Sequence, residues 1–114
     1  MIYECKVTDI VPLRMPKVYR VKTVCEDKEL EIELHEEIVE APKIGMKITV
    51  TVTNSKEECL SNYFCAHGYV VSNTQIGDVY RVVISLHGFL VVVKSKTPLE
   101  HKELEHLYVG VTYT

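Results

Sequence analysis

A nearly uncharged stretch in the C-terminal half constrains the fold of this chain more than any other feature. Between Ile76 and Val93 the only charged residues are Asp78 and Arg81. A strand with one face in water alternates apolar and polar residues, whereas a strand buried on both faces is an almost continuous apolar run. A chain of 114 residues has too small a core to bury both faces of a sheet. We therefore expect part of the outer face of this sheet to contact a large partner protein.

The same region contains a short near-repeat. Residues 66–71 read AHGYVV and residues 86–91 read LHGFLV. Two such copies indicate two similar strand starts and not a solenoid. Gly68 and Gly88 are expected at bulges or sharp bends, which small barrels need for closure.

Strand-like patterns recur along the whole chain. Alternation of apolar and polar residues is strict at 30–35 and 46–53, and turn-like or proline-containing segments separate the runs. Many short strands at such intervals are typical of an all-β barrel or sandwich. The expected strands cover residues 2–11, 17–25, 30–35, 46–53, 64–72, 78–86, 88–95 and 107–113.

Composition is that of an ordinary globular protein. With 46% hydrophobic and 25% charged residues the chain is not disordered, and its length predicts one domain over residues 1–114. The net charge of −3 disfavours avid nucleic-acid binding, which normally needs a basic surface. The N-terminus does not resemble a signal peptide, and no apolar run is long enough to span a membrane. We expect a cytoplasmic protein with no membrane partner.

Cysteine and histidine patterns do not predict a catalytic or metal site. Without an export signal or a CxxC pair, reduced thiols are expected for the four cysteines. His101 and His106 are five residues apart, whereas HExxH places its histidines four apart on one helical face. Cys65 and His67 share a strand face, which we expect to be core or interface. No catalytic residue, metal or cofactor is therefore expected.

The N-terminal hairpin is locally basic through Arg14, Lys17, Arg20 and Lys22. Basic and aromatic residues on a barrel face can hold single-stranded nucleic acid. These four residues are therefore the candidate nucleic-acid contacts. Because Lys17, Arg20 and Lys22 do not share one face by alternation, an ordinary solvated strand is the competing interpretation.

Taken in order, these strand patterns resemble the eighth subunit shared by eukaryotic nuclear RNA polymerases and, more closely, its archaeal counterpart, the G subunit of DNA-directed RNA polymerase. Two departures occur: histidine replaces the aromatic residue before each glycine, and Asn54–Asn62 is much shorter than the acidic loop of eukaryotic members. The second departure favours the archaeal branch. The segments that carry the resemblance are 5–12, 19–21, 30–34, 45–50, 67–70, 87–90 and 107–111.

The resemblance implies a closed antiparallel barrel of about eight strands, of the oligonucleotide/oligosaccharide-binding type. It also implies a non-catalytic subunit that docks on the largest RNA polymerase subunit and its neighbours, with indirect or weak DNA or RNA contact. Two alternatives stay open: a free single-stranded nucleic-acid-binding barrel, and a small hydrolase or thiol enzyme that lacks a recognisable nucleophile and base. The residues expected at the partner contact are Val79, Val83, Phe89, Val91 and Val93.

Overall fold

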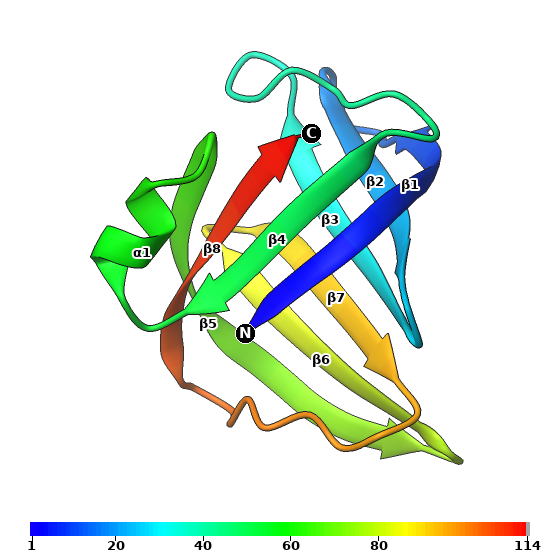
Figure 1. The fold of residues 1–114 in the computed structure, drawn as a ribbon, viewed down its shortest axis with the longest axis vertical. Helices are drawn as coiled ribbons and strands as arrows, with labels where there is room; N and C mark the ends of the chain where they lie inside the picture. The colour runs from blue at the N-terminus through cyan, green and yellow to red at the C-terminus, as the bar shows by residue number, and fades with distance from the viewer. Residues whose placement is uncertain (114) are drawn as a thin grey trace.

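The computed structural model describes residues 1–113, and within them eight strands close into an antiparallel barrel (Figure 1). Around the barrel the strands follow the order β1-β2-β3-β7-β6-β5-β8-β4, and β4 pairs back with β1. The all-β closed barrel expected above is confirmed. The elements are β1 (Ile2–Pro12), β2 (Val18–Cys25), β3 (Lys28–His35), β4 (Lys47–Thr53), α1 (Lys56–Leu60), β5 (Phe64–Ile76), β6 (Val79–Leu86), β7 (Phe89–Ser95) and β8 (His106–Tyr113).

Alternation of side chains builds the barrel interior. In β3, Leu30, Ile32 and Leu34 are buried, while the glutamates between them face outward. Every strand contributes inward residues in the same way, so aliphatic side chains fill the interior. A closed barrel has no free sheet edge, and each strand therefore has two hydrogen-bonded neighbours.

The long first strand closes the barrel. Its first half, Ile2–Lys6, pairs with β4, and its second half, Lys6–Pro12, pairs with β2. The register shifts between Val7 and Asp9, as at a β-bulge. Bulges bend a strand and increase its twist, which lets one strand serve two parts of the barrel wall.

The largest departures from the predicted elements lie around β5. This strand continues to Ile76 because it forms a long hairpin with β6, whereas the predicted strand ended at Ser72. The polar segment before it, expected to be a turn, contains α1. Ser55 caps that helix by accepting a hydrogen bond from the Glu58 N–H. A helix of five residues is too short to produce a visible helical period.

The two His-Gly copies occupy different structural positions. His87 and Gly88 both have positive φ (55° and 100°) in the two-residue turn between β6 and β7, as the twist of a tight hairpin requires. Gly68 instead lies within β5, where an added Cβ would fall 2.1 Å from the Ser85 carbonyl oxygen. The expectation of a sharp bend is met at Gly88. The bulge in β5 comes later, between Val70 and Ser72.

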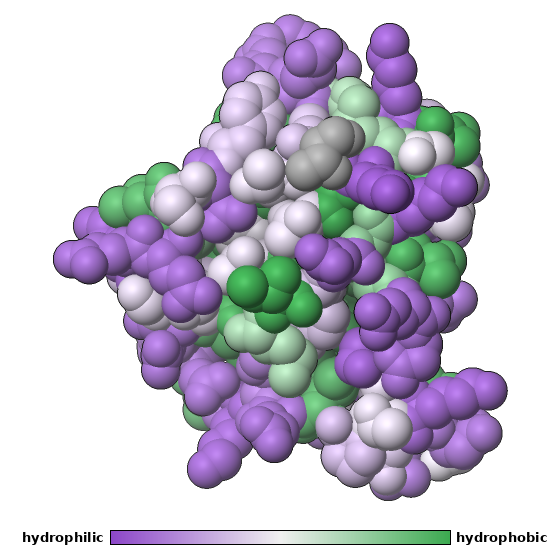
Figure 2. All heavy atoms as spheres, in the orientation of Figure 1, coloured by the Kyte–Doolittle hydropathy of each residue, from purple (hydrophilic) through white to green (hydrophobic). Residues whose placement is uncertain are grey.

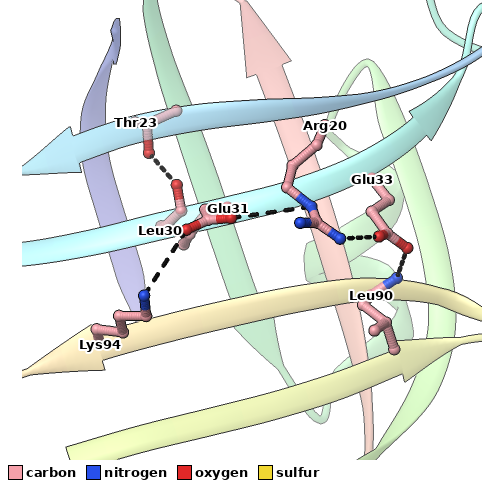
Figure 3. Close-up of polar contacts among 7 residues, drawn as sticks. All are labelled: Arg20, Thr23, Leu30, Glu31, Glu33, Leu90 and Lys94. Atoms are coloured by element: carbon pink, nitrogen blue, oxygen red, sulfur yellow. Dashed lines mark hydrogen bonds and ion pairs between the residues drawn. The ribbon is translucent and has the colours of Figure 1, made fainter. Parts of the chain in front are cut away.

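One side chain extends the hydrogen bonding between β3 and β7 beyond the backbone pairs. Backbone pairing runs from Lys28–Ser95 to Ile32–Val91 and then stops. Beyond it, the Leu90 N–H donates to Glu33 Oε1 at 2.9 Å, and Glu33 Oε2 accepts from Arg20 at 2.6 Å (Figure 3). The Glu33 carboxylate thus links β2, β3 and β7 where the main-chain ladder ends.

The four cysteines form two disulfides, Cys5–Cys25 and Cys59–Cys65, which corrects the expectation of reduced thiols. Cys5 and Cys25 face each other across β1 and β2, and both side chains are buried in the barrel. Cys59 on α1 is tied to Cys65 on β5. These pairs are brought together by the fold, so their spacing along the chain did not reveal them.

Opening either disulfide is expected to destabilise the barrel. With sequence separations of 20 and 6 residues, chain entropy predicts losses of about 3 kcal/mol for Cys5→Ala/Cys25→Ala and about 2 kcal/mol for Cys59→Ala/Cys65→Ala. Urea unfolding of the two variants and the unmodified chain measures both values. As a further comparison, the unmodified chain is reduced until all four thiols can be titrated. If this reduced chain unfolds at the same urea concentration as the oxidised chain, the disulfides do not stabilise the barrel.

The Glu33 link is tested by truncation. Glu33→Ala leaves the Leu90 N–H and the Arg20 guanidinium without this acceptor, and we expect a loss on the order of 2 kcal/mol in the free energy of unfolding. Glu33→Gln keeps a neutral acceptor and should lose less. Glu29→Ala, an exposed glutamate on the same face of β3, is the matched control and should change stability by less than about 0.5 kcal/mol. Equal effects of Glu33→Ala and Glu29→Ala would refute the role of the link.

Candidate interaction surface

The five residues predicted to contact a partner lie in three environments. Val83 is on the outward side of β6, since its neighbours Val82 and Ile84 belong to the core. Val91 and Val93 are fully buried inside the barrel, and their prediction as contact residues is corrected. An unbroken apolar run does not reveal which residues face inward. Of the other two, Val79 is half-buried beside the β5–β6 turn, and Phe89 is half-buried at one end of the barrel.

Apolar side chains instead gather at outward positions of β5, β6 and β7, with Ser72 and Ser85 among them. Val83 pairs with Val92 on one side and with Ser72 on the other, and Ser85 lies between Leu90 and Tyr69 in the same way. Val71 is the extra residue of the β5 bulge. Tyr69 and Val71 are 43% and 45% exposed, and Leu90 and Val92 are half-buried. We call Tyr69, Val71, Val83, Leu90 and Val92 the β5–β7 apolar face; Val83, at its centre, is only 7% exposed.

Charged residues border this face. Arg81 pairs with Lys94 in the next outward row, and Glu31 lies opposite Val92 on β3. The surface around β1 and β4, seen in Figure 2, is by contrast mainly hydrophilic with separate apolar spots. An apolar surface rimmed by polar residues is typical of a protein contact site. Of its residues only Val83 was predicted from the sequence, because the register set by the His87-Gly88 turn was needed to assign inward and outward positions.

Acidic residues pair with two of the four basic residues of the N-terminal hairpin. Arg20 lies 2.6 Å from Glu33 and 3.8 Å from Glu31, and Lys17 forms an ion pair with Glu37. Lys22 pairs in register with Glu31 on the neighbouring strand. Arg14 lies in the exposed connection between β1 and β2. The outward faces of β2 and β3 therefore alternate in sign and do not form a coherent basic groove, which backbone recognition of nucleic acid requires.

The cysteine and histidine candidates do not form a nucleophilic site. Cys65 is bonded to Cys59 and carries no thiol. His67 stacks on His106 at a ring distance of 5.5 Å and contacts Tyr108 at 4.9 Å. His101 lies apart from that cluster, with Nδ1 3.8 Å from Glu105. Burial lowers the pKa of His101, and Glu105 partly opposes this effect.

Neither a metal cluster nor a membrane-spanning helix occurs within residues 1–113. In this part of the chain, no three His, Cys, Asp or Glu side chains are grouped closely enough to hold a metal ion. No helix in the described residues combines the length and apolar character needed to cross a bilayer.

An apolar pocket at the barrel end is a second surface that the sequence analysis missed. Its volume is about 190 Å³, and it opens between β3, the β6–β7 turn and the start of β5. The residues come from four separate segments, so no local pattern predicts them. We call it the mouth pocket; its lining is Glu33, Leu34, His35, Ile38, Phe64, Ala66, Leu86, His87 and Phe89.

Known proteins resemble this chain over its whole length. The family of the G subunit of DNA-directed RNA polymerase matches residues 1–113. The DNA-directed RNA polymerase protein Rpo8 of Sulfolobus acidocaldarius is 30% identical over 113 residues, covering 94% of this chain and 93% of that protein. A solved structure of the cytoplasmic molybdate-binding protein ModG covers 98% of this chain and 89% of its own, with 12% identity and a TM-score of 0.39, too low to support an inference. The chain therefore belongs to the G-subunit family and is a subunit of a DNA-directed RNA polymerase.

Proposed function

We propose that this chain is a non-catalytic, peripheral subunit of an archaeal RNA polymerase that docks on the largest subunit and stabilises the assembled enzyme. The β5–β7 apolar face is the observation that carries the proposal. Burying Tyr69, Val71, Leu90 and Val92 against a partner would remove apolar surface from water, the main favourable term in protein association. The charges that border the face would fix the orientation of the partner.

Catalysis is assigned to other subunits. Nucleotidyl transfer needs positioned charges or metal ions at the reacting phosphates. The acidic pair Glu31 and Glu33 on this chain is occupied with Arg20 and Lys94. We propose that this subunit contributes binding and rigidity, and that it acts in the cytoplasm as part of the polymerase.

Direct nucleic-acid contact is proposed to be weak or indirect. Arg20 and Lys17 are ion-paired within the chain, and the net charge is −3. The observation that favours the alternative, a free single-strand-binding barrel, is the ring cluster of His67, His106 and Tyr108. Aromatic rings can stack on bases, but such binding also needs a positively charged groove. Titration with labelled single strands at low and high salt separates the two proposals.

Docking is tested by two matched substitutions. Val71→Asp places a charge on the β5–β7 apolar face, while Val24→Asp makes the same change on the outward side of β2, at a residue of nearly equal exposure (45% and 44%). An unpaired charge in an apolar contact is costly, so we expect Val71→Asp to weaken binding to polymerase tenfold or more. Val24→Asp should bind within about twofold of the unmodified chain.

The measurement is affinity purification of tagged full-length chains after nuclease treatment, with the polymerase subunits quantified by mass spectrometry. Unfolding curves of both variants control for stability. Equal recovery of polymerase with Val71→Asp and Val24→Asp would rule out this face as the docking surface. Cross-linking of the bound chain identifies the contacted subunit, and cross-links that reach every subunit except the largest would reject that assignment.

A further inference from the structure

The mouth pocket exists because the barrel wall opens at the β3–β7 seam. Main-chain pairing between these strands ends at Ile32 and Val91, and the Glu33 side chain then replaces the ladder. Beyond that point, Leu34 and Phe89 line a pocket and do not face each other as a strand pair. The inward residues Ala66 and Leu86 form its base.

The size of the pocket restricts its occupant. Its volume is about 190 Å³, and its lining is mainly apolar. An apolar cavity of about 150 Å³ accepts a benzene-sized group. Small-molecule sites usually occupy about 300 Å³ or more. The pocket therefore fits one large apolar side chain and not a cofactor-sized ligand.

A turn fixed by two tyrosine hydrogen bonds forms part of the rim of the mouth pocket. The segment from Glu36 to Glu40 lies between β3 and β4, and Ile38 projects from it with 67% exposure. The Tyr19 hydroxyl donates to the Val39 carbonyl at 2.7 Å, and the Tyr113 hydroxyl donates to the Glu40 carbonyl at 2.6 Å. Burial raises the pKa of Tyr19 to about 12, further above neutral pH than its ordinary value. A rim fixed before binding needs little ordering when a partner arrives.

Two negative charges in this turn lack ionic partners within the described chain, and each lies two residues from Ile38, which lines the pocket. Glu33 is paired with Arg20, and Glu37 with Lys17. Glu36 and Glu40 flank Ile38, are exposed, and form no ion pair with any residue from 1 to 113. An apolar pocket beside unpaired carboxylates is complementary to an apolar side chain that has a lysine or arginine close to it.

We propose that the mouth pocket receives one large apolar side chain of another polymerase subunit, and that a basic residue next to that side chain pairs with Glu36 and Glu40. This inference rests on the proposed docking function and adds a specific anchor to it. The pocket adjoins the β5–β7 apolar face at Glu33, which lines the pocket and accepts a hydrogen bond from the backbone N–H of Leu90 in the face. One partner surface can therefore cover both.

Two independent changes test the anchor. Ala66→Leu fills the pocket from inside without adding charge, and Glu36→Lys/Glu40→Lys reverses the rim charge without changing the pocket. Glu4→Lys/Glu100→Lys is the matched charge control, since both residues are exposed and have no ion pair within the described chain. The probe is polymerase of the same organism assembled without this subunit, titrated with fluorescently labelled full-length chain at two salt concentrations.

We expect Ala66→Leu to bind tenfold or more weakly while its thermal midpoint stays within a few degrees of the unmodified chain. The rim reversal should also bind tenfold or more weakly, and its affinity should no longer fall as salt rises, because salt screens the new repulsion between like charges, whereas the control stays within about twofold. Unchanged affinity and salt dependence of the rim reversal would overturn the proposal, even if Ala66→Leu fails to fold.

Other outcomes separate this inference from the docking proposal. Val71→Asp could abolish binding while Ala66→Leu and the rim reversal leave it intact. In that case the proposed side-chain anchor in the mouth pocket is wrong, and docking through the apolar face stands. If Val71→Asp, Ala66→Leu and the rim reversal all bind normally, neither the apolar face nor the mouth pocket is the docking surface. Light scattering on the isolated chain addresses a second copy as the occupant: a dimer lost on Ala66→Leu, with polymerase binding unchanged, overturns the anchor in favour of self-association.

Discussion

Closure of the barrel is the constraint on which the rest of the structure depends. Eight short strands satisfy their main-chain groups only if each has two neighbours, and β1 provides this by pairing with both β2 and β4. Two strands beyond β1 the wall closes between β3 and β7, where a short ladder is extended by the Glu33 carboxylate. The register of these pairs decides which side chains fill the interior and which remain outside.

Because side chains fill the barrel interior, binding sites must lie on the surface. Aliphatic side chains occupy the inside of the barrel, as expected for a barrel of this strand number, and leave little room there for a ligand. What remains for recognition is the outward side of the strands and the ends of the barrel. The β5–β7 apolar face and the mouth pocket both lie on the β6–β7 side of the molecule, which suits a subunit that docks on a larger assembly.

The sequence predicted most of the fold because alternation is a direct consequence of strand geometry. The pattern at Leu30–Leu34 identified β3, and the inward and outward residues followed from it. The same reasoning failed at Val91 and Val93, since β7 is apolar on both sides and only its pairing with β6 distinguishes them. Alternation cannot be detected in such a strand, because apolar residues occupy both the inward and the outward positions.

The remaining errors concern contacts between distant segments. Cys5 and Cys25 meet because β1 and β2 pair in one particular register, and neither spacing nor composition encodes that register. The ion pairs of Arg20 were not foreseen for a similar reason, since β3 brings two glutamates beside it. Such cross-strand contacts need the topology and cannot be read from local sequence.

The central claim is that the β5–β7 apolar face is covered in the polymerase, and hydroxyl-radical footprinting tests it most directly. Oxidation of Tyr69 and Val71 is compared between the free chain and the chain assembled into polymerase, with Ile2 and Val24 as exposed references on other strands. The account predicts that Tyr69 and Val71 are strongly protected on assembly while Ile2 and Val24 are oxidised as before. Protection of Ile2 and Val24 with unchanged oxidation of Tyr69 and Val71 would contradict it.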